Sequence, residues 1–250
     1  MKTAYFDCFA GASGDMMLGA LVDAGLDIDT LKEEIGKLNL SHYDLQAKKI
    51  SKRGIGGTQI AVLIDSDHHD HEHRHLGDIE AIIEASRLDP SVKEKSMEIF
   101  RRLAEAEARV HRTSIDKVHF HEVGAMDAII DIVGTTAGIN ALGVARVCCS
   151  PLHVGSGTVQ CAHGVLPVPA PATAELVKGF PVYSDGVIGE LLTPTGAAVL
   201  TTLSAEFGPM PAMTVERIGY GSGSSDPSIP NLLRVFIGEN GDHTTSHDPE

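Results

Sequence analysis

The segment that decides the fold is residues 3–24, TAYFDCFAGASGDMMLGALVDA. Its first seven residues are mostly apolar or aromatic and predict a strand. Residues 11–14 predict a tight turn, and the apolar residues that follow predict a helix over 15–24. Backbone N–H groups at such a helix start can hold a phosphate or carboxylate. The candidate binding residues of this turn are Gly11, Ser13, Gly14 and Asp15. The turn has neither a Walker A nor a GxGxxG pattern, so a plain tight turn is the alternative.

Strands and helices are interspersed along the rest of the chain, which predicts an α+β (mixed α/β) fold. Strands are expected over 43–64, as a hairpin, and over 144–149, 213–220 and 232–237. Helices are expected over 30–38, 76–87, 91–112, 125–142 and 172–178, and a strand–turn–helix over 189–203. Residues 1–238 form the expected folded region, with a possible boundary near 66–75 or 143–150. Residues 239–250 are expected to be a disordered linker or tail.

The composition excludes several functions. The 250 residues include 20 Lys and Arg against 34 Asp and Glu, which gives a net charge of −14. This charge argues against nucleic acid or an anionic membrane as the main partner. No segment approaches the roughly 20 apolar residues of a membrane span, and the N-terminus lacks a signal-peptide pattern. The four cysteines show no CxxC spacing, so we expect them to be small buried residues of a cytoplasmic protein.

A histidine tract is the most unusual feature. Five of the 13 histidines fall within eight residues: His68, His69, His71, His73 and His75. Neutral imidazole is a good ligand for nickel, copper and zinc, and a loop that carries several can wrap an ion. The tract therefore predicts metal binding, and the alternative is a solvated acidic loop.

A second group of ligand-type residues comes from three consecutive elements. It comprises Glu107, His111, His119, His121, Glu122, Asp127 and Asp131. Glu107 and His111 are four apart on an expected helix and so share a face, as do Asp127 and Asp131. The two aspartates lie in an apolar helix, where an ionised carboxylate is costly unless it is paired or bound to metal. The group predicts a site for metal binding or acid–base chemistry, against the alternative of helix caps and buried salt bridges.

A second turn, Thr193–Pro194–Thr195–Gly196, opens another expected helix. Thr193 is a plausible N-cap and Pro194 suits the first turn. Thr193, Thr195 and Gly196 are candidates for anion binding, although an ordinary helix start is the better explanation of this turn from the sequence alone.

Four long motifs occur in one order. They are YFDCFAGASGDMMLGALVDAG (5–25), VHFHEVGAMDAIIDIVG (118–134), HGVLPVPAPATAEL (163–176) and GELLTPTGAA (189–198). Together with the internal histidine tract, they resemble the LarC nickel-insertion proteins of nickel-pincer nucleotide cofactor biosynthesis. The resemblance runs from about residue 5 to residue 237.

The resemblance implies a specific reaction. Family members insert nickel into pyridinium-3,5-bisthiocarboxylic acid mononucleotide, and so form the cofactor of lactate racemase and related enzymes. The metal ends bonded to two sulfurs and one ring carbon, in a CTP-dependent cyclometallation of the lyase class. The resemblance makes the five histidines of the tract, with Glu107 and His111, the expected nickel ligands. It makes His119, His121, Glu122, Asp127 and Asp131 the expected catalytic group, without individual roles.

Full-length family members are longer, and a C-terminal domain is associated with the CTP-dependent step. We therefore expect CTP, with Mg²⁺ or Mn²⁺, to act through that domain or through a split partner, because this chain resembles a truncated or split N-terminal portion. A homo-oligomer is also expected. Two other functions remain open: a nickel chaperone or store without catalysis, and an unrelated metal-dependent phosphoester hydrolase.

Overall fold

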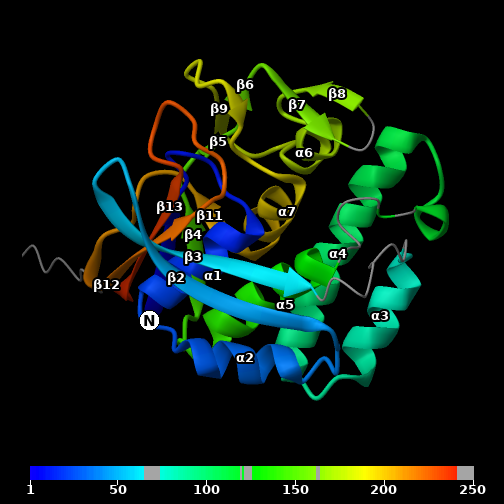
Figure 1. Cartoon of the computed structure of the whole chain (residues 1–250), viewed down its shortest axis with the longest axis horizontal. Helices are drawn as coiled ribbons and strands as arrows, with labels where there is room; N and C mark the ends of the chain where they lie inside the picture. The colour runs from blue at the N-terminus through cyan, green and yellow to red at the C-terminus, as the bar shows by residue number, and fades with distance from the viewer. Residues whose placement is uncertain (65–73, 119, 121–125, 162–163, 241–250) are drawn as a thin grey trace, which may run out of the picture.

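The computed structural model describes residues 1–64, 74–118, 120, 126–161 and 164–240. Its centre is a seven-stranded mixed sheet with strand order β11-β4-β1-β13-β12-β3-β2 (Figure 1). The strands are β1 (Lys2–Asp7), β2 (Tyr43–Lys52), β3 (Ile55–Ile64), β4 (Arg146–Cys149), β11 (Ser204–Phe207), β12 (Met213–Ser222) and β13 (Leu232–Asn240). With its surrounding helices this sheet confirms the expected α+β class.

The first strand lies in the middle of the sheet. β1 pairs in parallel with β4 and antiparallel with β13, the last strand of the chain. Ala4 and Phe6 are buried, which explains the nearly continuous apolar character of this segment. The predicted strand over residues 3–9 is therefore confirmed, apart from its last two residues.

Helices cover the sheet and one another (Figure 1). Helix α1 (Gly14–Asp23) packs against β12 and β3, and α5 (Met126–Ala141) packs against α1. Helix α5 also contacts α2 (Ile28–Gly36) and α4 (Pro90–His111), and α4 contacts α3 (Leu76–Ala85). Because neighbours surround α5, most of its residues are buried, as its apolar sequence predicted. A short 3₁₀ helix, Ile115–Lys117, follows α4.

Short strands and two helices form the remaining part, above the sheet in Figure 1. The strands are β5 (Leu152–His153), β6 (Gly155–Ser156), β7 (Thr158–Cys161), β8 (Gly164–Pro167), β9 (Val182–Tyr183) and β10 (Gly189–Glu190). Strands β7 and β8 form an antiparallel pair. Helix α6 (Pro171–Leu176) and helix α7 (Pro194–Leu203) both pack against α4.

The end of the last strand differs from the prediction. β13 continues to Asn240, whereas the expected strand ended at 237 and the expected tail began at 239. Glu239 pairs with Lys2 and Thr214 through the backbone, and its carboxylate lies 2.6 Å from the N-terminal amine. Backbone pairing on both sides holds these polar residues in the sheet, and this pairing leaves no apolar pattern in the sequence.

Several expectations fall on residues that are not described: residues 65–73 of the histidine-rich loop, the residues 119 and 121–122 of the second ligand group, and residues 241–250 of the tail. The possible domain boundaries near 66–75 and 143–150 stay predictions. Within the described ranges, no helix has the length and apolar character needed to cross a bilayer.

Candidate functional site

Two adjoining cavities bring together many of the candidate residues. The first, here called the acidic cavity, has a volume of about 430 Å³. The second, here called the histidine cavity, has a volume of about 350 Å³. Glu190, the last residue of β10, and Pro194, the first residue of α7, line both cavities, so the two share a wall. The acidic cavity is lined by Ser13, Gly14, Asp15, Gln59, Ile60, Ala61, Val62, Asp127, Asp131, Glu190, Thr193, Pro194, Thr195 and Ser224.

The two predicted turns lie against each other at the acidic cavity. Ala12 N donates to the Leu191 carbonyl over 2.9 Å, and Thr193 N donates to the Ala12 carbonyl over 3.1 Å. Gly196 N donates to Thr193 Oγ1 over 3.1 Å, which confirms Thr193 as the N-cap of α7. These bonds hold the start of α7 beside the start of α1.

Gly11 and Gly196 lie where the backbones of the two turns touch, and not at the cavity surface. A Cβ atom at Gly11 would lie 1.9 Å from the Leu191 carbonyl oxygen, and one at Gly196 would lie 2.2 Å from the Ala12 carbonyl oxygen. Both glycines therefore allow the two backbones to approach, and neither lines the two cavities. The remaining five candidates of the turns line the acidic cavity: Ser13, Gly14, Asp15, Thr193 and Thr195.

Asp131 has an unusual electrostatic environment. It projects from α5 towards the start of α1, where a Cβ atom at Gly14 would lie 2.4 Å from Asp131 Oδ2. Asp131 Oδ1 is buried and has no hydrogen-bond partner in the described part of the chain. Burial, and then the charges of Asp15 and Asp127, raise the pKa of this carboxyl well above its ordinary range. Asp131 therefore keeps its proton to a higher pH than an ordinary aspartate.

The other two aspartates are in different environments. Burial is the main cause that raises the pKa of Asp15, and the hydroxyl of Ser13, which donates to Asp15 Oδ1, opposes that shift. Asp127 is exposed, and its Oδ1 accepts a 2.8 Å hydrogen bond from Ala128 N. The predicted common face of Asp127 and Asp131 is confirmed, because both line the acidic cavity. The expected burial cost applies to Asp131 and not to Asp127.

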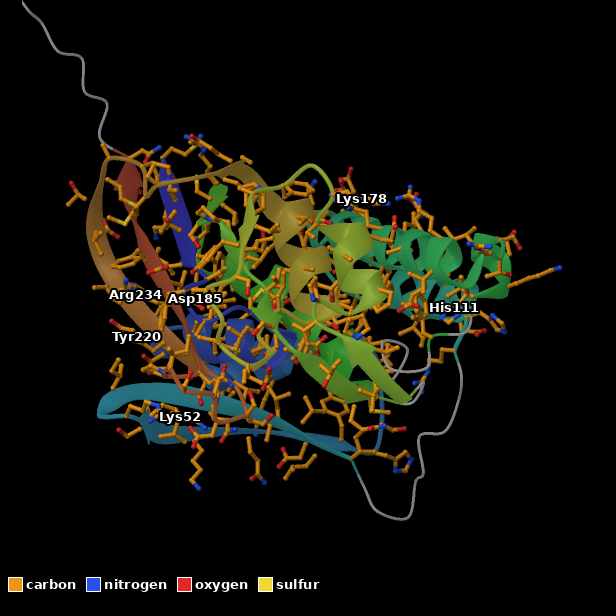
Figure 2. All side chains as sticks on the ribbon, turned by 90° about the horizontal axis from the view of Figure 1, so that it is seen from above. Lys52, His111, Lys178, Asp185, Tyr220 and Arg234 are labelled. Carbon is orange, nitrogen blue, oxygen red and sulfur yellow. The ribbon has the colours of Figure 1, made fainter. Side chains whose placement is uncertain are left out.

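Glu107 and His111 line the histidine cavity from α4. Glu107 Oε2 lies 3.4 Å from His111 Nε2, so their predicted common face is confirmed. The other lining residues are Val110, Val159, Gln160, Cys161, Leu166, Ala170, Pro171, Ala172, Glu190 and Pro194, mostly from β7, β8 and α6. Figure 2 shows His111 far from Arg234 and Asp185, near the opposite side of the molecule.

Sequence reasoning missed Glu190 and Cys161. Glu190 stands three residues before the N-cap Thr193, within one of the motifs, so proximity to a candidate turn was the available signal. Cys161 was expected to be buried like the other cysteines. Cys8, Cys148 and Cys149 are buried, but Cys161 is partly exposed and lines the histidine cavity.

His75, the last residue of the histidine tract, lies at the N-terminus of helix α3. Its backbone N–H donates to Asp78 Oδ2 over 2.8 Å at the start of α3. Its Nδ1 lies 3.0 Å from the Val118 carbonyl oxygen. His75 lines neither of the two cavities.

The other members of the histidine tract (His68, His69, His71 and His73) lie outside the described residues, as do His119, His121 and Glu122. Among the residues that are described, no three His, Cys, Asp or Glu side chains are placed to hold one metal ion. The described part of the two cavities thus presents separate ligand-type side chains, and not a closed metal cage.

The chain is similar to known nickel insertion proteins. It is 58% identical to the pyridinium-3,5-bisthiocarboxylic acid mononucleotide nickel insertion protein of Desulfitobacterium hafniense (strain DSM 10664 / DCB-2). The alignment of 239 residues covers 96% of this chain and 59% of the relative. It is 52% identical over 240 residues to a putative nickel insertion protein of Citrifermentans bemidjiense, with 96% and 62% covered. A putative nickel insertion protein of Dictyoglomus thermophilum is 49% identical over 239 residues, with 96% and 61% covered.

The chain thus spans about three fifths of the length of these relatives. No solved structure matches it. The family model described as nickel insertion protein matches residues 4–249, nearly the whole chain. The chain therefore belongs to the nickel insertion protein family.

Proposed function

We propose that this chain binds pyridinium-3,5-bisthiocarboxylic acid mononucleotide and takes part in inserting nickel into it, which yields the nickel-pincer nucleotide cofactor. The observation that carries the proposal is the acidic cavity, where Asp15, Asp127, Asp131 and Glu190 converge beside the histidine cavity. The pyridinium nitrogen and the nickel ion are both cationic, and together they outweigh the two thiocarboxylates, so the ring with its nickel has a net positive charge. Carboxylates in a partly enclosed site favour cations more strongly than they would in open water.

Nickel is a substrate of the proposed insertion reaction. Imidazole and carboxylate are suitable ligands for it, so the tract His68, His69, His71, His73 and His75 would gather the ion. Glu107 and His111 would then bind nickel at the histidine cavity, whose wall at Glu190 is shared with the acidic cavity. Side chains that bind the ion separately can release it to the two sulfurs of the substrate, which a closed four-ligand cage would oppose.

The carbon–nickel bond takes the electron pair of a ring C–H bond, and the proton must pass to a base. We assign this step to the catalytic group predicted from the sequence: His119, His121, Glu122, Asp127 and Asp131. Within this group, the raised pKa of Asp131 suits it to hold a proton near the substrate and not to accept one. Asp127 is exposed at the same cavity and is the better acceptor of the two.

CTP does not fit the acidic cavity. A triphosphate there would face four acidic residues, and the start of α1, which could otherwise attract phosphate, already faces the Asp131 carboxyl group. We propose that CTP, with Mg²⁺ or Mn²⁺, binds the additional length that the relatives carry, as a covalent domain or a separate partner. When bound, it would supply the activation that makes the reaction CTP-dependent. Assembly as a homo-oligomer is part of the same proposal.

The test is an anaerobic reaction of the mononucleotide with Ni²⁺ and CTP–Mg²⁺, followed by the absorbance of the nickel-pincer product. It is run with this chain joined to the additional length of the relatives and with this chain alone. The test variant is Glu190→Gln, which removes a charge from both cavities. The matched control is Glu216→Gln, which removes the same charge from an exposed position on β12.

The proposal expects the first variant to lower the rate of product formation at least about tenfold, because it loses an attraction to two cations. The control should match the wild type. Equal rates for both variants would contradict the proposal. Product formation by the additional length alone, at saturating free nickel, would support the chaperone alternative.

A further inference from the structure

A basic turn lies at the end of the β2–β3 hairpin. Residues 48–53, KKISKR, contain four of the 20 basic residues of a chain whose net charge is −14. Lys52 is the last residue of β2, and Arg53 begins the turn to β3. A solvated hairpin end would explain such charges if nothing else lay near them.

A third cavity, here called the basic cavity, lies at this turn. Its volume is about 560 Å³, and it is lined by Ile50, Ser51, Lys52, Arg53, Gln59, Ser222, Ser224 and Asp226. Gln59 and Ser224 also line the acidic cavity. The two cavities therefore share a boundary along β3 and the loop that follows β12, so one ligand can extend from one into the other. Figure 2 shows Lys52 on the opposite side of the molecule from His111.

The basic side chains are held over this cavity by the loop between β12 and β13. Lys52 Nζ donates to the Ser225 carbonyl over 3.1 Å, and an Arg53 guanidinium nitrogen donates to the Pro227 carbonyl over 2.7 Å. Asn231 Nδ2 donates to Ser225 Oγ over 2.7 Å and so secures the loop. An ammonium has three N–H donors and a guanidinium has five, so these bonds leave donors on both cations for an anion.

Asp226 reduces the positive charge only in part. Its carboxylate is 4.0 Å from the Arg53 guanidinium, and 74% of the Asp226 side chain is exposed. A pair at this distance in water is weak, and an incoming dianion competes with it effectively. The hydroxyl groups of Ser222 and Ser224 add possible donors to the lining.

We propose that the basic cavity is the subsite for the phosphate monoester of the mononucleotide, a proposal that rests on the function proposed above. At one end the substrate carries a pyridinium ring with two thiocarboxylates, which has a net positive charge once it holds Ni²⁺. At the other end, beyond a ribose, it carries an anionic phosphate. The acidic cavity takes the ring with its nickel, and the basic cavity takes the phosphate. Opposite charges in two adjoining cavities thus fix the direction in which the substrate binds.

The test compares two ligands by calorimetry under anaerobic conditions: the mononucleotide, and the nucleoside made from it by removing the phosphate. The full chain is used as wild type and as the double variant Lys52→Gln/Arg53→Gln. Lys48→Gln is the matched control, since Lys48 is exposed on the same strand and does not line the cavity. Lys52→Arg, which keeps the charge and the donor to the loop, tests for a merely structural role. Thermal melting confirms that each variant folds.

The wild type should bind the mononucleotide at least about tenfold more tightly than the nucleoside, and added salt should reduce this ratio. The double variant should bind both ligands equally, with unchanged affinity for the nucleoside, whereas Lys48→Gln and Lys52→Arg should keep the preference. A preference that survives in the double variant would overturn the phosphate subsite and leave the proposed function intact. A wild type that binds neither ligand would overturn the proposed function itself, and this subsite with it.

Discussion

The contact between Gly14 and Asp131 gives a prediction whose size can be worked from the structure. In Gly14→Ala, the new Cβ atom would lie 2.4 Å from Asp131 Oδ2, 2.5 Å from its Cβ and 2.6 Å from its Cγ. Real Cβ atoms essentially never approach a neighbour within 3.0 Å. The Cβ of Asp131 is fixed to the backbone of α5 and cannot rotate away. The two helices must therefore separate by about half an ångström in a closely packed region.

Overpacking of this kind costs about 1–3 kcal/mol of unfolding free energy. For a chain of this size, each kcal/mol lowers the melting temperature by about 2–4 °C. Calorimetric melting of the full chain measures the shift. Gly36→Ala is the matched control, because a Cβ atom at Gly36, at the end of α2, meets nothing within 4 Å.

The control should leave the melting temperature unchanged or raise it slightly, since alanine favours helix over glycine. In the double variant Gly14→Ala/Asp131→Gly, all three contacting atoms are removed, so the cost of the alanine at position 14, measured against Asp131→Gly alone, should largely disappear. A Gly14→Ala protein that melts like the wild type would refute the placement of Asp131 at the start of α1.

Three further predictions concern Asp131, His111 and the histidine tract. Asp131→Asn should raise the unfolding free energy near pH 7.5, and this gain should shrink towards pH 4. Because the pKa of Asp131 is raised in the folded state, the folded wild type binds more protons than the unfolded chain. The stability of the wild type therefore falls as the pH rises above the unfolded pKa, and asparagine removes this loss. Urea unfolding at both pH values measures this difference, and an equal gain at both would contradict it. His111→Ala should weaken nickel binding in calorimetric titrations at pH 7.5, because it removes an imidazole ligand from the histidine cavity; Arg112→Ala, on the next residue, is the control. Deletion of residues 67–73, which contain no apolar side chain, should lower the number of nickel ions bound in equilibrium dialysis and leave the melting temperature unchanged, and an unchanged nickel count would show that these histidines are not ligands.

Local patterns in the sequence were sufficient for most helices and strands. The helix over 91–112 was predicted from apolar residues at helical spacing, and Met97, Phe100 and Leu103 on that face are buried. The hairpin over 43–64 was predicted from its glycines. The order of the strands in the sheet could not be predicted in this way. β13 lies between β1 and β12 through backbone hydrogen bonds, which do not depend on the identity of the side chains.

In the candidate site, too, local contacts could be predicted from the sequence and long-range contacts could not. Spacing within one helix correctly placed Glu107 with His111, and Asp127 with Asp131, on common faces. The meeting of α1, α5 and α7 at one cavity depends on long-range packing, which no local spacing encodes. Glu190 was missed for this reason, since its role follows from the wall that it contributes to two cavities.

The central claim is that the substrate and nickel meet in the adjoining acidic and histidine cavities. The most direct measurement is anomalous diffraction at the nickel absorption edge, from crystals of this chain grown with the mononucleotide and Ni²⁺. We expect a nickel peak at or beside the wall formed by Glu190, with the pyridinium ring in the acidic cavity. A well-occupied mononucleotide bound outside both cavities, with its nickel, would show that the substrate and nickel do not meet there.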